Sequence, residues 1–389
     1  MSRKMSETVS SLGYINKIFQ NVKLVNATQQ ENFYYSLVKS GVIIPSAEGR
    51  SKGALSIVCS EMAKMRKGKI IVDRSDLGFP GRDISEAAPI LKHRYGHVSL
   101  LINSGSGKSL MPLIDAQNMA LYVEKTGDSK NFSIDVMTSD INSPIGKLGE
   151  KYGNVLLIKG RERNERVEGE AREFQAYGIL EDVFILCSTV LLYAMAEAMN
   201  DDKPADKIQD YIRPLSVEIG SMVDDVIKSK FFEFLLDNLE ERKACFFAGL
   251  GSGQEVARMT AVRVGHVKRA IGDHVYVGGE SSTPAPRAGD VLVAISRSGE
   301  TEIVVSWCKN FKRLGGKLAA IVGTPGSTLQ SISDESYVIK SERIPGKPSN
   351  FYVKAAFALS PLPIYLVNRI EERGLKLPEY ILSWYHSVI

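Results

Sequence analysis

Two short polar stretches, each set between apolar runs, carry residue types that bind oxyanions. NSGSGKS at residues 103–109 is hereafter the first serine loop, and SRSGET at residues 296–301 is the second serine loop. Each combines small hydroxyls, a glycine and a cation at a predicted strand-to-helix turn, where free backbone N–H groups and the helix dipole favour a tetrahedral anion. The candidate anion-binding side chains are Asn103, Ser104, Ser106, Lys108, Ser109, Ser296, Arg297, Ser298 and Thr301.

A glycine turn precedes each serine loop in the chain. EGRSKG occupies residues 48–53, and GLGSGQE occupies residues 249–255. Arg50, Ser51 and Ser252 begin the helices that these turns predict, so we add them to the candidate anion-binding residues. Helix capping alone would explain one such loop. Two loops in the same order, each preceded by a glycine turn, favour a binding role.

Several classes of function are excluded by pattern or composition. The GxxxxGK[ST] motif of a nucleotide-binding P-loop would require glycine where Ile102 stands. The net charge of +4 arises from 49 basic and 45 acidic side chains with no long block of like charge, which argues against a nucleic-acid partner. The four cysteines lie far apart in apolar stretches without CxxC spacing, which indicates reduced core residues and no metal site.

The location expected from the sequence is the cytoplasm. The N-terminal segment lacks the apolar core of a signal peptide, and no window has the roughly 18 uninterrupted apolar residues of a membrane-spanning helix. The nearest apolar run, residues 183–199, contains Glu197 and is predicted to be a buried helix. We therefore expect no membrane partner.

The elements predicted around the serine loops follow the same order in both halves. Alternating strands and helices indicate parallel βαβ units, with helices on both faces of each sheet. We expect two α/β domains, residues 14–200 and 208–375, joined by the polar stretch 200–207 and followed by a tail, 376–389. The first half has a predicted helix 29–39, a strand, turn and helix within 41–62, and strands within 69–75, 97–109, 132–139 and 154–160. The second has helix 208–240, strand 243–251, helix 252–270, strands 274–279 and 290–296, helix 300–314, and strands 317–323 and 336–340.

Three segments of the second half, taken in order, resemble a known family. They are GLGSGQEVARMTAVRVGH, VYVGGESSTPAPRAGDVLVAISRSGETEIVV and TPGSTL. At this spacing they are similar to the SIS (sugar isomerase) domain, and especially to 3-hexulose-6-phosphate isomerases, over about residues 243–340. In the first half, EGRSKGA, INSGSGKS and GEAREFQAYGILEDVFIL match the SIS pattern less closely. The last of these segments is similar to the one that follows the first SIS domain of tandem-SIS phosphoglucose/phosphomannose isomerases. The resemblance implies two SIS-type three-layer α/β domains, each a parallel sheet flanked by helices.

The resemblance also implies an aldose-ketose isomerase that acts, without metal or other cofactor, on a hexose with an anionic group at C6. This reaction needs a group that opens the ring, a base that moves a proton between C2 and C1, and donors for the enediolate oxygen. His266 lies where 3-hexulose-6-phosphate isomerases carry a histidine, and Glu280 and Glu181 match acidic positions of that family. These three are the candidate catalytic residues.

Two assemblies of the site remain open at this point. One builds it from the first serine loop, Arg50 and Ser51 with His266 of the second half. The other pairs the second serine loop with Glu181. Lys64 stands at the first-half position that corresponds to His266, so the two sites are predicted to be unequal.

The substrate anion and the class of function also leave alternatives. A serine loop with one cation accepts either a phosphate or a singly charged sulfonate, so a 6-sulfo-hexose (sulfoquinovose) is an alternative substrate. SIS domains also serve as sugar-phosphate sensors in regulators, which is the non-catalytic alternative. We expect a homodimer, because SIS sites commonly borrow residues across domains and the helix at 183–199 offers an apolar surface.

Overall fold

The protein contains two parallel five-stranded sheets of one topology. The computed structural model describes residues 9–74, 84–160, 179–280, 282–341 and 343–377, and only the backbone of residues 179–182. Within these ranges the strand order is β2-β1-β3-β4-β5 in the first sheet and β7-β6-β8-β9-β10 in the second, read from equivalent edges. The predicted fold class, two α/β units with helix-flanked parallel sheets, is confirmed.

The first half alternates strands and helices around the first sheet. β3 and β4 are buried along their whole length, as expected for central strands covered on both faces. The sequence did not predict α4, because Pro89 lies inside it and proline disfavours a helix interior. The elements are α1 (Gly13–Lys23), α2 (Ala27–Lys39), β1 (Val42–Ser46), α3 (Gly49–Met62), β2 (Ile70–Ile71), α4 (Ile84–Tyr95), β3 (Val98–Asn103), α5 (Leu110–Thr126), β4 (Phe132–Thr138), α6 (Pro144–Tyr152), β5 (Gly153–Leu157) and α8 (Ile179–Asn200).

The second half repeats this plan. The prediction of one helix over 208–240 was wrong, because the Ser229 side chain accepts a hydrogen bond from the Phe232 N–H and begins a new helix. The elements are the 3₁₀ helix η3 (Ala205–Lys207), α9 (Ile208–Val226), α10 (Lys230–Leu239), β6 (Cys245–Gly249), α11 (Ser252–Ala270), β7 (Val275–Val277), β8 (Val291–Ser296), α12 (Glu302–Arg313), β9 (Lys317–Val322), α13 (Thr328–Ile332), β10 (Glu335–Val338), α14 (Phe351–Leu359) and α15 (Leu362–Glu372).

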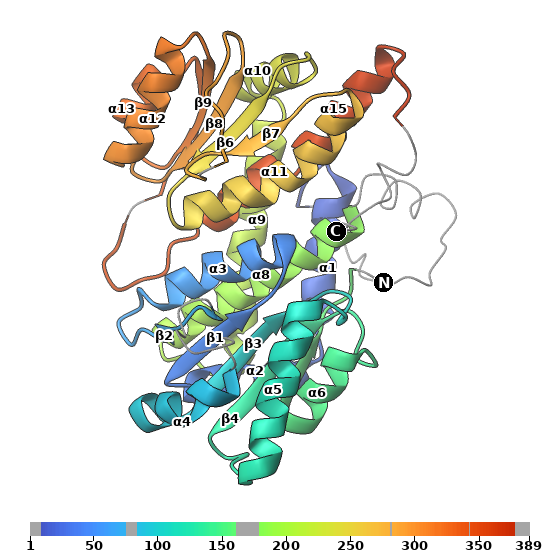
Figure 1. Cartoon of the computed structure of the whole chain (residues 1–389), viewed down its shortest axis with the longest axis vertical. Coiled ribbons are helices and arrows are strands. Elements are labelled where there is room, and N and C mark those ends of the chain that lie inside the picture. Colours follow the sequence, from blue (N-terminus) through green and yellow to red (C-terminus); the bar gives the residue numbers. More distant parts are fainter. Residues whose placement is uncertain (1–8, 75–83, 161–178, 281, 342, 378–389) are drawn as a thin grey trace, which may run out of the picture.

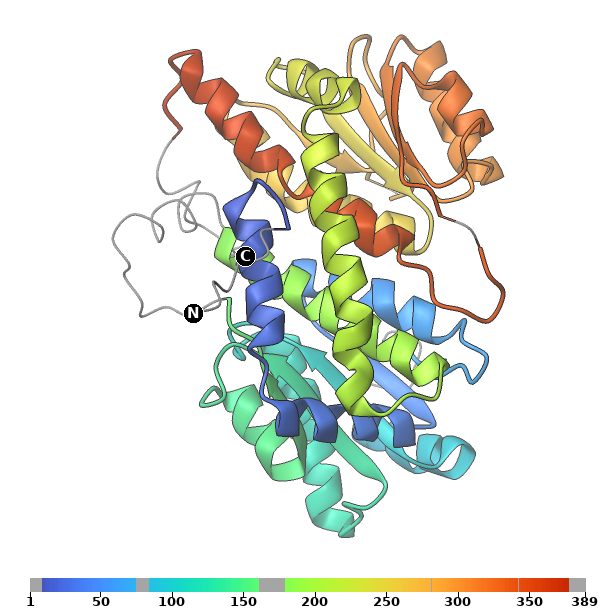
Figure 2. The same cartoon turned by 180° about the vertical axis from the view of Figure 1, so that it is seen from behind.

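The two halves share one hydrophobic core. In Figure 1 the first sheet lies below and the second above, with α3, α8 and α11 between them. A Cβ placed on Gly53 of α3 would lie 2.6 Å from Met259 Cγ of α11, so these helices approach closely at that point. Figure 2 shows α9 running across the front of both halves in that view, and it packs against α1, α8 and α14. One cluster of buried side chains accordingly includes residues of both halves.

Helix α8 is the apolar run that the sequence predicted to be a buried helix. Its stretch Val183–Asn200 has a mean hydropathy of 1.6, long and apolar enough to cross a membrane, but 89% of it is buried inside this chain. It packs against α1, α3 and α9. The sequence left open whether this helix packs within the chain or between chains, and the structure shows packing within the chain. The homodimer itself stays a prediction. The four cysteines are buried free thiols, as predicted.

Candidate functional site

The first serine loop joins β3 to α5 and is closed by its own hydroxyls. Ser104 Oγ lies 2.9 Å from Ser109 Oγ. The Lys108 N–H donates to Ser106 Oγ over 3.3 Å. Gly107 has a φ of 58°, a left-handed conformation that glycine adopts without steric cost. These bonds bring the loop hydroxyls to the start of α5.

The second serine loop joins β8 to α12 with the same geometry. Ser296 Oγ lies 3.2 Å from Thr301 Oγ1. The Glu300 N–H donates to Ser298 Oγ over 3.2 Å. Gly299 takes the place of Gly107, with a φ of 67°. The two loops are copies of one local structure.

The loops differ in what lies at the start of the next helix. In the first half the Glu48 carboxylate accepts a hydrogen bond of 2.7 Å from the Met111 N–H, in the first turn of α5. The carboxylate of Glu48 therefore occupies the start of α5, which is where the helix dipole would favour an anionic ligand. The glycine turns align at Gly49 and Gly251, whose φ values are 54° and 57°, and this alignment places Leu250 opposite Glu48. The second half has no equivalent carboxylate in its glycine turn.

Two buried hydroxyls of the second half have no hydrogen-bond partner among the described residues. They are Ser252 Oγ, at the start of α11, and Ser327 Oγ, just before α13. A Cβ on Gly299 would lie 2.1 Å from Ser327 Oγ, which places that hydroxyl against the loop. In the first half, by contrast, the Ser143 hydroxyl before α6 donates to the Asp140 carbonyl and accepts from the Gly146 N–H. Buried hydroxyls without partners fit a position for a polar ligand.

A cleft of about 590 Å³ opens beside the second serine loop, between the two halves. Arg297 brings this loop to the cleft, while α3, α8 and α9 supply other walls together with the segment from β10 to α14. Among the described residues, six basic side chains and three acidic ones line the cleft, a balance that favours an anionic ligand. They are Lys64, Arg297, Lys340, Arg343, Lys347 and Lys354, and Glu61, Glu197 and Glu218.

Two of the three carboxylates are held in ion pairs. Glu61 binds Lys64 Nζ at 2.7 Å and also accepts from the Ser349 N–H over 2.9 Å. Glu218 binds Lys354 Nζ at 2.6 Å. Within the described part of the chain, the other four cations of the cleft have no carboxylate at ion-pair distance. Their charge is therefore available to a ligand.

Glu197 has a pKa well above the ordinary range of a carboxyl group. Burial raises its pKa to about 7, with additional raising by Asp201 and Glu218, while a hydrogen bond with Tyr193 and the charge of Lys347 lower it. A carboxyl group with a pKa near 7 is suited to take up and release a proton at neutral pH.

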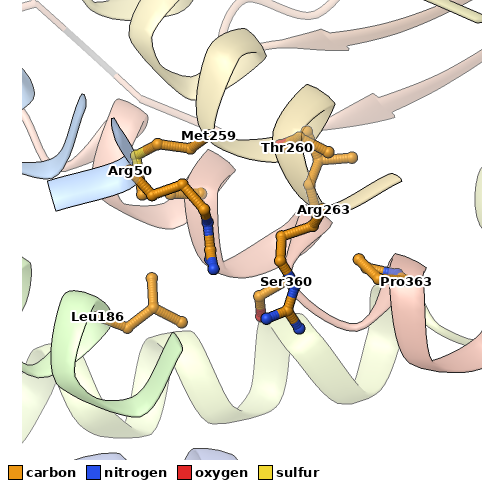
Figure 3. A pocket seen from close by; sticks show the side chains of 9 residues that line it. Arg50, Leu186, Met259, Thr260, Arg263, Ser360 and Pro363 are labelled. Atoms are coloured by element: carbon orange, nitrogen blue, oxygen red, sulfur yellow. The ribbon is translucent and has the colours of Figure 1, made fainter. Parts of the chain in front are cut away.

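A nearly closed cavity lies where α3, α8 and α11 meet the junction of α14 and α15. The cavity there measures about 20 Å³, close to the room needed by one water. Arg50 from α3 and Arg263 from α11 both point into it, above Leu186 and Ser360 (Figure 3). Their side chains are 8% and 7% exposed. A hexose does not fit this space, and Arg50 lies apart from the open cleft.

Of the predicted catalytic residues whose side chains are described, neither His266 nor Glu280 lines the cleft. His266 lies one turn beyond Arg263 on α11, is half-buried, and is absent from the cleft lining. Glu280 is exposed, and its carboxylate accepts from Arg258 Nε over 3.3 Å. The side chain of Glu181 lies outside the described residues.

Comparison with known proteins gives the family. The sequence profile of the SIS domain matches residues 238–359. A 3-hexulose-6-phosphate isomerase of Bacillus subtilis is 30% identical over 144 residues, which are 37% of this chain and 72% of that protein. The chain belongs to the SIS-domain family. A 3-hexulose-6-phosphate isomerase of Mycobacterium gastri is 38% identical over 94 residues, 24% of this chain and 45% of that one.

The similarity to a solved structure covers both SIS units. The putative phosphosugar isomerase of Silicibacter pomeroyi superposes with a TM-score of 0.59 at 13% identity, covering 93% of this chain and 97% of that one. At this identity the likeness establishes the fold alone. Matches to the first curated relatives cover 55%, 58% and 55% of their lengths, so the chain spans little more than half of each.

The two SIS units divide the predicted anion-binding residues. Arg297 lines the cleft, and Ser252, Ser296, Ser298 and Thr301 belong to the same SIS unit. Ser51 and the first serine loop lie in the other unit, where the Asn103 amide donates to Ser188 Oγ over 3.1 Å and to the Ser51 carbonyl over 3.4 Å.

Sequence reasoning missed the cleft residues outside the serine loop, chiefly Glu197, Lys340, Arg343 and Lys347. A signal was present for Glu197, since it is the single charged residue of the apolar stretch 183–199.

Proposed function

We propose that this chain is an aldose-ketose isomerase acting on a hexose with a phosphate at C6. The observation that carries the proposal is the cationic cleft of about 590 Å³ that adjoins the second serine loop. Membership of the SIS family, with 3-hexulose-6-phosphate isomerases among its relatives, supports a sugar isomerase.

In this proposal the second serine loop receives the phosphate. The loop hydroxyls, the N–H groups at the start of α12 and the buried hydroxyl of Ser252 supply donors, and Arg297 supplies a positive charge. The first serine loop is less suited to this role, because Glu48 already lies at the start of its helix. The unequal surroundings of the two loops thus favour the second.

The sugar then extends from the loop into the cleft. Cations on the β10 side, Lys340, Arg343 and Lys347, supply charge for the enediolate oxygen that develops as the proton moves. Six cations against three carboxylates favour a phosphate, which carries about two charges at neutral pH, over a singly charged sulfonate.

Proton NMR in D2O tests this function. The purified chain is incubated separately with glucose 6-phosphate, fructose 6-phosphate, 3-hexulose 6-phosphate and 6-sulfo-glucose. We expect isomerisation of a phosphorylated sugar, with deuterium appearing at the carbon that receives the proton. Turnover of the sulfonate alone would contradict the phosphate assignment. Thermal stabilisation by a sugar phosphate without any exchange would favour a sensor instead.

A further inference from the structure

We propose that Glu197 is the catalytic residue that carries the proton between C2 and C1 of the sugar. The assignment rests on the function proposed above, and it differs from the three residues that the sequence indicated. The proton carrier then lies on α8 of the first half, and the phosphate would be held by the second serine loop. Glu197 and Arg297 of that loop line the same cleft.

Glu197 interrupts a buried stretch of α8. Its neighbours Ala196, Ala198 and Met199 are buried, whereas Glu197 itself is half-buried and lines the cleft. Burying a carboxylate along an apolar helix costs free energy. The side chain is therefore partly withdrawn from water and faces the ligand space, as a proton carrier requires.

Glu197 differs from Glu61 and Glu218, the other described carboxylates of the cleft, in its contacts. Glu61 is held by Lys64 and by the Ser349 N–H, and Glu218 is held by Lys354. Among the described residues, Glu197 has no cation within 4.0 Å. An ion-paired carboxylate is a weaker base, because the cation stabilises its charged form. Glu197 is thus the cleft carboxylate best able to accept a proton.

The charged surroundings of Glu197 set the pH at which it works. On its own helix it faces Tyr193 and Asp201, from α9 it faces Glu218, and from the segment after β10 it faces Lys347. The remaining charged groups of the cleft are Glu61 and Lys64 on α3, Lys354 on α14, and Arg297, Lys340 and Arg343. Burial outweighs the lowering effects of Tyr193 and Lys347, and the pKa rises to about 7.

The proposed step moves one proton and creates no redox imbalance. The Glu197 carboxylate removes the proton on C2 of the open-chain aldose, and the C–H electron pair becomes the C1=C2 double bond. The carbonyl pair moves to O1, which gives an enediolate. The protonated carboxyl then returns its proton to C1, while O2 passes its proton to O1 and becomes the new carbonyl oxygen.

The first experiment compares the wild-type chain with Glu197→Gln and Glu197→Asp by deuterium exchange in D2O. Loss of a general base costs about 10²- to 10⁴-fold in kcat. We expect a loss of this size in Glu197→Gln, with unchanged binding of inorganic phosphate, and a partial recovery in Glu197→Asp. Exchange at the wild-type rate in Glu197→Gln would overturn the role of Glu197 alone. Absence of turnover by the wild-type chain would overturn the proposed function as well.

The pH profile supplies a readout that a structural role would not change. In the wild-type chain we expect kcat/KM to rise with pH up to about 7 and then level off, because the base must be deprotonated. The charge of Asp201 raises the pKa of Glu197, so in Asp201→Asn the rise of kcat/KM should occur at lower pH. The plateau value of kcat/KM should stay the same. Asparagine can still accept the hydrogen bond from the Tyr211 hydroxyl. A rise at the wild-type pH in Asp201→Asn would contradict the assignment.

Discussion

Arg297 is the residue that connects the second serine loop with the cleft. It is half-buried, and within the described part of the chain it has no carboxylate at ion-pair distance. A guanidinium in this position can donate two parallel hydrogen bonds to a phosphate.

Arg297→Ala should therefore weaken the binding of a sugar phosphate. A hydrogen bond to a charged group contributes about 1.5–3 kcal/mol, which corresponds to a loss of roughly 10- to 100-fold in affinity. Isothermal titration with inorganic phosphate and with a sugar 6-phosphate measures the loss. Arg313→Ala, at the exposed far end of α12, is the matched control. Equal affinities in the two variants would show that Arg297 does not contact the anion.

Glu197 also gives the folded protein a pH dependence that can be measured without substrate. Its pKa is about 7 in the folded chain, above the ordinary value of 4.5, so the folded state binds the extra proton between these pH values. The raised pKa of Glu197 therefore contributes to the free energy of unfolding in full below about pH 4.5. This contribution is lost as the pH rises to about 7 and the carboxyl group ionises in the folded chain.

The melting temperature of the wild-type chain relative to Glu197→Gln should accordingly fall over this pH interval and stay constant above it. Circular dichroism of both chains on the same pH series makes the comparison. A constant difference would mean that the pKa of Glu197 is not raised.

At the scale of elements, the two strand-loop-helix units offer a matched pair of substitutions. A Cβ on Gly107 would lie 1.8 Å from Ser143 Oγ, and a Cβ on Gly299 would lie 2.1 Å from Ser327 Oγ. Both glycines also have positive φ.

Alanine at either glycine should lower the free energy of unfolding, by about 1–3 kcal/mol. Only Gly299→Ala should also abolish phosphate binding. Urea unfolding and phosphate titration of both variants separate the two effects. Loss of phosphate binding in Gly107→Ala would move the anion site to the first serine loop.

The elements were largely predictable because their signals are local. Apolar strands that end in glycine or serine turns mark both sheets, and the two serine loops were found from their hydroxyl spacing alone. The break at Ser229 was missed because amphipathic helices flank it on both sides.

The cleft was not predictable from the sequence in this way. Glu61, Glu197, Glu218 and Lys347 are separated by long stretches of chain, and only the packing of α3, α8 and α9 beside the segment after β10 brings them together. The carboxylate of Glu48 at the start of α5 is likewise a contact between residues far apart in sequence. No spacing rule reveals such contacts.

At the scale of the whole molecule, the described residues line an open cleft at Arg297 of the second serine loop and a nearly closed cavity between α3 and α11. The two volumes are about 590 and 20 Å³. We expect one sugar phosphate to bind per chain, which calorimetric titration measures as a stoichiometry of one. Two equivalents would show that the Arg50 and Arg263 cavity opens to admit a ligand.

The walls of the cleft come from both halves, and backbone contacts already connect them there. The Arg66 N–H of the first half donates to the Gly346 carbonyl of the second over 3.1 Å, and the Ser349 N–H donates to Glu61. A ligand held by the second serine loop and by Glu197 would act as a noncovalent cross-link between the halves. Saturation with the ligand would then stabilise both SIS units together, because the bound molecule adds contacts to each half of a chain that already shares one core.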